Sequence, residues 1–155
     1  MIEVEIADAA WSAALPDAEA LVVRAAEAAL GASPPRKGEG LTVLLTDDAV
    51  VGDLNARFRG KDAATNVLSF PAPPNPEHHL GDIALAHGVC AREAAAQGKT
   101  LAAHLQHLVA HGVLHLLGYD HENDREAETM EGLERVILAG LGVADPYAAE
   151  QGHDA

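Results

Sequence analysis

Residues 107–121 read HLVAHGVLHLLGYDH, and both the fold and the chemistry depend on this stretch. It predicts the end of a helix that Thr100 opens and Gly118 closes. His111 and His115 are four residues apart on this helix, so their side chains project from one face. Gly118 can take the left-handed conformation that reverses the chain, which brings His121 back towards the same point.

This arrangement predicts a three-histidine zinc site at the end of the central helix. Three neutral nitrogen ligands with one open position are typical of a catalytic zinc and not of a structural one. A lone pair of histidines four residues apart is a weak signal, but the full H-x3-H-x2-G-x2-H pattern gives each element a separate geometric reason. We therefore expect His111, His115 and His121 to hold one Zn²⁺ per chain, with His107 as a candidate neighbour of the ligands. His104 lies on nearly the same helical face, and we expect it to be a polar group near the helix surface.

The same spacing occurs in the metzincin proteases, whose motif is H-E-x-x-H-x-x-G-x-x-H. Those enzymes place the general-base glutamate directly after the first histidine. Here that position is Gly112, which has no side chain to take a proton from water. The pattern thus predicts the metal ligands of a hydrolase without the base of a protease.

The remaining segments predict an α+β fold, a single domain with a four-stranded mixed sheet packed with about five helices. Alternating or β-branched runs predict the strands, and caps and glycine stops bound the helices. The expected strands are residues 2–6, 41–46, 66–70 and 80–85, and the expected helices are 17–30, 47–58, 88–97, 100–117 and 124–141. The proline-rich residues 71–79 predict a loop at the rim of a site. We expect the domain to cover residues 1–145 and residues 146–155 to form a loosely ordered tail.

Composition limits the class of protein. The 155 residues carry 24 acidic and 10 basic side chains, a formal net charge of −14, which argues against a simple nucleic-acid binder. A polyanion would have to be met by a metal or by a local patch such as Arg57, Arg59 and Lys61. No apolar run approaches the ~20 residues of a membrane span, so no membrane partner is expected. The first residues do not resemble a secretory signal. The single cysteine, Cys90, suits a reducing cytoplasm, and we expect it to be a small buried apolar side chain.

Residues 107–121 also resemble the signature of the YbeY family of bacterial endoribonucleases and rRNA maturation factors. The resemblance extends over about residues 40 to 141. Further stretches match the family's motifs in the same order along the chain: residues 54–59, 65–71 and 81–83, and then Glu128, Met130 and Glu134 in the last expected helix. One site is a variant, since many family members have Asp where Asn66 stands.

The resemblance implies a small zinc-dependent, single-strand-specific endoribonuclease. Its three histidine ligands would be His111, His115 and His121, and the family's arginine after the first strand–helix pair corresponds to Arg59. The implied substrate is precursor 16S rRNA, cleaved in 3′-end maturation and ribosome quality control. The implied partners are the small ribosomal subunit and its assembly proteins. Arg59 would then stabilise negative charge on the transition state, because a guanidinium pairs well with phosphate.

Several roles stay open from the residues alone. Asp82 is either a hydrogen-bond partner that orients a histidine ligand or a turn or strand-edge residue, and Asp120 either bonds a ligand or caps the next helix. No residue is identified as the general base. Two other functions also remain: a metal-dependent hydrolase of another substrate, and a non-enzymatic ribosome assembly factor whose zinc stabilises the fold.

Overall fold

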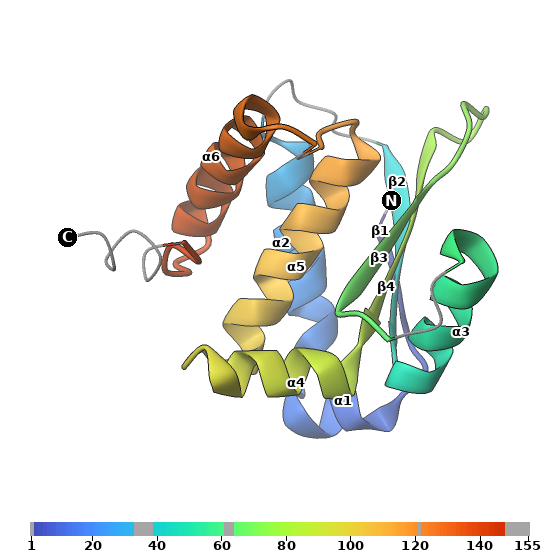
Figure 1. Ribbon diagram of the computed structural model, residues 1–155, viewed down its shortest axis with the longest axis vertical. Coiled ribbons are helices and arrows are strands. Elements are labelled where there is room, and N and C mark those ends of the chain that lie inside the picture. Colours follow the sequence, from blue (N-terminus) through green and yellow to red (C-terminus); the bar gives the residue numbers. More distant parts are fainter. Residues whose placement is uncertain (1, 33–38, 61–63, 121, 148–155) are drawn as a thin grey trace.

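The computed structural model of the chain describes residues 2–32, 39–60, 64–120 and 122–147. Among these residues a four-stranded sheet is combined with six helices (Figure 1). In chain order the elements are β1 Ile2–Ile6, α1 Ala9–Ala14, α2 Ala18–Leu30, β2 Gly40–Thr46, α3 Asp48–Arg59, β3 Val67–Pro71, β4 His79–Ala86, α4 His87–Ala96, α5 Leu101–Leu116 and α6 Asp124–Gly140. The predicted α+β class and the mixed sheet are confirmed.

The sheet has the order β1-β2-β4-β3, with β1, β2 and β4 parallel and β3 antiparallel to β4. Side chains alternate between its two faces, so each row across the strands belongs to one face. The row that faces α5 contains Val4, Val43, Ile83 and Ser69, and the next row, on the opposite face, contains Glu3, Thr42, Asp82 and Phe70. The alternation separates an apolar, helix-covered face from a more polar one.

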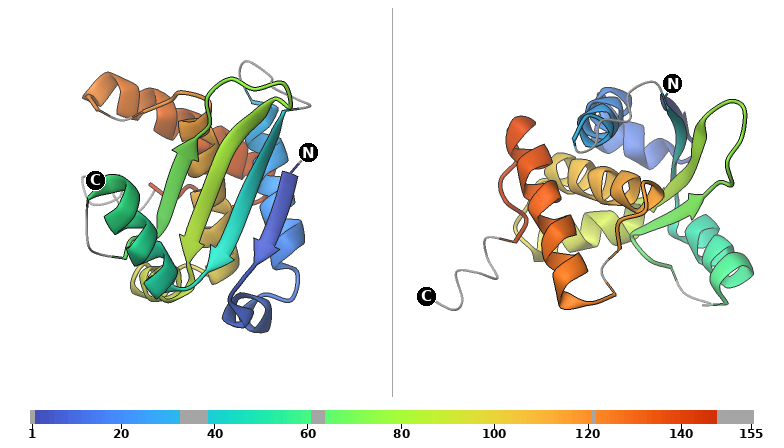
Figure 2. Two further views of the ribbon diagram at one scale, coloured as in Figure 1. Left: turned by 90° about the vertical axis from the view of Figure 1, so that its right-hand side faces the viewer. Right: turned by 90° about the horizontal axis from the view of Figure 1, so that it is seen from above.

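Helices cover the two faces unequally. Helices α2, α5 and α6 lie together on one side, where α5 packs against α2, α6, β3 and β4 (Figure 1). On the other side α3 packs near β3 and β4 and leaves much of the strand length uncovered by helix (Figure 2, left). The main hydrophobic core lies beneath α2 and α5, and α5 is buried along most of its length.

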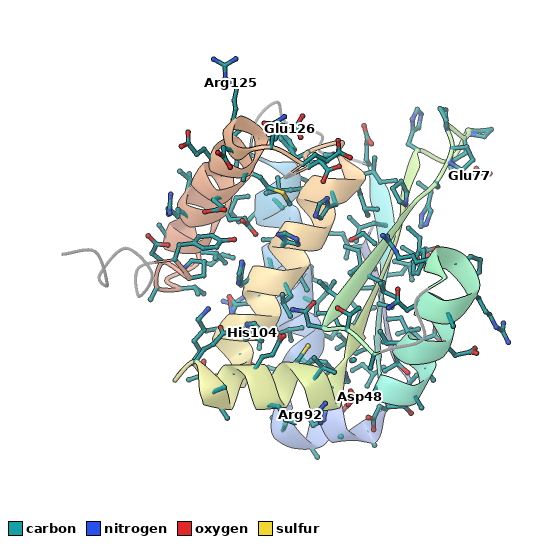
Figure 3. The ribbon with its side chains drawn as sticks, in the orientation of Figure 1. Asp48, Glu77, Arg92, His104, Arg125 and Glu126 are labelled. Carbon is teal, nitrogen blue, oxygen red and sulfur yellow. The ribbon has the colours of Figure 1, made fainter. Side chains whose placement is uncertain are left out.

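Helix caps set the boundaries as expected. Asp47 accepts a hydrogen bond from the Val50 amide at 2.8 Å, and Thr100 accepts one from the Ala103 amide at 3.0 Å. Asp48 then ties α3 to α4, because its carboxylate accepts hydrogen bonds from the Val89 amide and the Arg92 guanidinium (Figure 3). The observed boundaries of the predicted elements differ from the predicted ones by at most one residue at either end.

Helix α1 was not predicted, because its six residues are too few to show a helical period. Its reason is tertiary: Trp11 is fully buried, and its indole N–H donates to the Thr46 carbonyl at 2.9 Å. The predicted burial of Cys90 is confirmed, and Met130 is buried as well. Burial raises the pKa of the Cys90 thiol to about 12, as expected of an unreactive core side chain. Within the described parts of the chain, we find no helix long and apolar enough to cross a bilayer.

Candidate active site

Two of the three predicted ligands meet at the C-terminal end of α5. The Nε2 atoms of His111 and His115 lie 3.1 Å apart, and both side chains are partly exposed. Gly118 follows with a φ of +102°, a conformation that favours glycine, so the expected chain reversal occurs. His121 lies outside the described residues, and among those described no three metal-ligating side chains form a group. The structure thus brings His111 and His115 together and leaves the position of His121 a prediction.

The two imidazoles have the geometry of ligands that share one ion. Two nitrogens bound tetrahedrally to zinc at ~2.0–2.1 Å would be about 3.3 Å apart, close to the 3.1 Å found here. His111 also bonds the Glu134 carboxylate through Nδ1 at 2.8 Å. Because a carboxylate only accepts, Nδ1 carries the proton and the neutral ring keeps its lone pair on Nε2. The donor set therefore fits a zinc ion.

Glu134 was matched to the family's last helix in the sequence, but its role in the site was not predicted. It is fully buried and accepts hydrogen bonds from His107 Nε2 at 3.2 Å, His111 Nδ1 at 2.8 Å and the Tyr147 hydroxyl at 2.7 Å. Burial by itself would raise the pKa of Glu134, but these hydrogen bonds and the electrostatic interaction with the His111 ring outweigh it and lower the pKa to about 2. The signal was a glutamate on the buried stripe of α6, four residues after Met130.

Asp145 and Tyr147 hold the segment after α6 against that helix. Asp145 accepts from Arg135 and from the Tyr147 amide, and the Arg135 guanidinium lies 5.3 Å from the Tyr147 ring centroid. Tyr147 lies in the segment 146–155 that was expected to be loosely ordered, and residues 148–155 lie outside the described residues. The contacts place the Tyr147 hydroxyl against Glu134, the carboxylate that also bonds His111.

A cleft of about 640 Å³ opens in front of the two histidines. Its walls come from α3, from the segment that leads into β3, and from the turn after α5. They include Asn55, Arg59, Thr65, Asn66, Ser69, His111, His115, Tyr119 and Asp120. Arg59, the predicted catalytic residue, thus lies in the same cleft as the histidines.

Arg59 is exposed and held by the strand opposite α3. Its Nη2 donates to the Ser69 carbonyl at 2.6 Å, and its guanidinium lies 5.7 Å from the Phe70 ring centroid. A guanidinium carries five N–H donors, so this single bond orients the side chain without using its capacity for phosphate. The geometry is consistent with the predicted role of Arg59 in binding a phosphodiester.

Packing gives a structural reason for a glycine at position 112. A Cβ at this position would lie 3.0 Å from Ile83 Cδ1 and 3.2 Å from Ile83 Cγ2, because α5 packs closely on β4 there. A side chain at position 112 would therefore point into the sheet and away from the cleft. Packing therefore disfavours a protease-type glutamate beside His111 in this fold.

The residues whose roles were open now have definite places. Asp82 lies on the sheet face opposite α5 and pairs with His79 at 3.1 Å, so it does not orient His111 or His115. Asp120 lines the histidine cleft. His104, expected near the helix surface, is buried and bonds Glu93 at 2.9 Å, because α4 covers that part of α5 (Figure 3).

Comparisons with known proteins agree on one family. The family model described as "Endoribonuclease YbeY" matches residues 4–142. Proteins named "Endoribonuclease YbeY" from Maricaulis maris and Paramagnetospirillum magneticum are each 52% identical to this chain. The alignments cover 96% of the chain and 92% and 96% of the relatives. A relative of the same name from Rhodopseudomonas palustris is 53% identical over 94% of the chain and 91% of its own length.

A solved structure shares the fold. The solution structure of TM1509 from Thermotoga maritima superposes with a TM-score of 0.56 at 24% identity, covering 91% of each chain. This likeness concerns the arrangement of sheet and helices.

Proposed function

This chain belongs to the endoribonuclease YbeY family, and from its site we propose that it hydrolyses single-stranded RNA in the cleft between α3, β3 and α5. One observation carries the proposal: the Nε2 atoms of His111 and His115 converge to 3.1 Å on the wall of a cleft that also contains Arg59. A metal-binding pair beside a guanidinium suits the cleavage of a phosphodiester.

We propose that His111, His115 and His121 hold one zinc ion. A zinc ion bound there would supply the Lewis-acid chemistry that phosphodiester hydrolysis needs. Glu134 keeps the proton of His111 on Nδ1 and so fixes the ring orientation and the ligand tautomer. Arg59 binds the non-bridging oxygens of the scissile phosphate and counters the negative charge that develops on them.

The net charge shapes how the substrate reaches the cleft. A chain at −14 repels naked RNA except near the metal and the α3 cations, so binding by the isolated protein should be weak and salt-sensitive. We propose that the substrate in the cell is the 3′ region of precursor 16S rRNA on the small ribosomal subunit. Basic assembly proteins of the cytoplasm would then offset the repulsion by contacting acidic surfaces of this chain.

The test is cleavage of an end-labelled single-stranded RNA that spans the 3′ end of precursor 16S rRNA. We expect wild type to cut and both Arg59→Glu and His115→Ala to lose cutting while remaining folded by circular dichroism. Arg57→Glu is the matched control, because Arg57 has the same charge on the same helix, is 69% exposed and pairs only with Asp53 among the ion pairs described.

Equal cutting by all four preparations would indicate a contaminating nuclease, and no cutting by wild type would contradict an intrinsic nuclease. Either result would instead favour an assembly factor whose zinc stabilises the fold. Loss of cutting in Arg57→Glu as well would show that general cationic charge, and not the placement of Arg59, is what the reaction needs.

A further inference from the structure

Both phenylalanines of the chain lie side by side at the surface next to the proposed active site. Phe58, at the end of α3, is 67% exposed, and Phe70 lies on β3. Their ring centroids are 5.6 Å apart with an interplanar angle of 66°. Single exposed apolar side chains are common, but the composition of this chain makes the pair unusual, since the whole chain has 2 Phe, 2 Tyr and 1 Trp.

The two rings line a groove of about 830 Å³ on the sheet face that carries α3. This groove shares Arg59, Ser69 and Pro71 with the histidine cleft, so the two hollows adjoin along β3. Arg59 stands at the junction, where its guanidinium faces the Phe70 ring and bonds the Ser69 carbonyl. A chain bound at the histidines can therefore continue past Arg59 onto the aromatic pair.

We propose that Phe58 and Phe70 form a stacking site for a base next to the phosphate that is cleaved. The inference rests on the proposed function, because its ligand is the single-stranded RNA of that proposal. Proteins bind single strands by stacking bases on aromatic side chains while cations contact the backbone. The exposed Phe58 supplies the accessible ring face, Phe70 supports it from the sheet, and Arg59 contacts the adjoining phosphate.

The charges in the groove set the orientation of the nucleotide. Glu5 and Asp82 also line it, and their carboxylates repel a phosphate. Carboxylates accept hydrogen bonds from exocyclic amino groups, such as those of cytosine and adenine. The backbone is thus directed to the Arg59 side and the base into the groove. The same acidity disfavours double-stranded RNA, which would bring two backbones to this face.

The experiment measures binding of a fluorescent, 2′-O-methyl-modified single-stranded 12-mer to the zinc-loaded protein by anisotropy, with strand integrity checked on a gel. We expect Phe58→Ala to weaken binding by about tenfold and Phe58→Trp to retain it. Val136→Ala is the control, because Val136 is 71% exposed on α6 and lines neither hollow. Melting temperatures of both alanine variants should match wild type, since neither side chain is buried.

A second measurement separates stacking from a general surface effect. The strands are a series of 12-mers, each with one abasic position. Wild type should bind one of them about tenfold more weakly than the intact strand, whereas Phe58→Ala should bind that strand and the intact strand equally well. The inference is overturned if Phe58→Ala binds every strand like wild type while wild type still cleaves RNA, a result that leaves the endoribonuclease intact. Wild type that neither binds nor cleaves RNA would overturn the proposed function and this inference with it.

Discussion

Replacing Glu134 by glutamine should weaken both the fold and the metal site. The carboxylate is fully buried and accepts from His107, His111 and Tyr147. A carboxamide has the same shape but only one accepting oxygen, and its NH₂ group cannot accept from any of the three donors. Glu134→Gln therefore breaks at least one of the three hydrogen bonds that the carboxylate accepts.

The size of the effect follows from the pKa of Glu134. The pKa of this carboxyl is about 2 in the folded protein, against an ordinary value of 4.5. Each pKa unit corresponds to 1.36 kcal/mol, so the native contacts favour the ionised form by about 3 kcal/mol. Because the folded pKa is the lower one, this stability is present above about pH 4.5 and is lost as the pH falls towards 2. We expect Glu134→Gln to lose about 2–3 kcal/mol at neutral pH, or roughly 4–12 °C in Tm.

The assay combines thermal unfolding of the apoprotein with zinc binding in competition with a chromophoric chelator. Loss of the bond that orients His111 should reduce zinc affinity by about 10- to 100-fold. Glu131→Gln is the matched control, because Glu131 lies on the same helix and faces Arg135 at 4.0 Å at the surface. Unchanged zinc affinity with a lowered Tm would show that Glu134 supports packing alone and would refute the orienting role.

The other predictions concern the cleft, the helix packing and a buried histidine. Arg59→Lys keeps the charge but loses the planar fork, so kcat/KM for RNA should fall by about 10- to 100-fold with little change in Tm. Gly112→Ala should lower the free energy of unfolding by about 1–3 kcal/mol in urea titrations, because the new Cβ would lie 3.0 Å from Ile83. Adding Ile83→Val should recover part of this loss, and no recovery would show that the strain lies elsewhere. Burial lowers the pKa of His104 below 6.5 against the opposing effect of Glu93, so below about pH 6.5 the unfolded chain binds the extra proton and the protein loses stability. Urea titrations at about pH 7.5 and 5.5 should show this loss of unfolding free energy in wild type and a smaller loss in His104→Gln. An equal loss in both proteins would assign the pH dependence to other groups.

Much of the secondary structure could be predicted because its causes are local. Asp47 and Thr100 cap their helices through bonds to amides three residues ahead, and strand alternation repeats every two residues. Helix α1 was missed because its stability comes from Trp11, which reaches the Thr46 carbonyl of β2. His104 was misplaced for the same reason, since helical spacing does not reveal which helix covers a given face.

Some features of the candidate site also have local causes, whereas others depend on contacts between distant segments. Residues 111–118 were enough to predict that His111 and His115 converge and that Gly118 turns the chain, because helix periodicity and glycine's freedom at positive φ act over a few residues. No periodicity relates His111 to Glu134, which bonds it from 23 residues away. The packing of α6 on α5 makes that pair, and the sheet register places Asp82 on the far face. The spacing of nearby residues therefore predicted that His111 and His115 meet, whereas the groups that orient them and line the cleft depend on how distant segments pack.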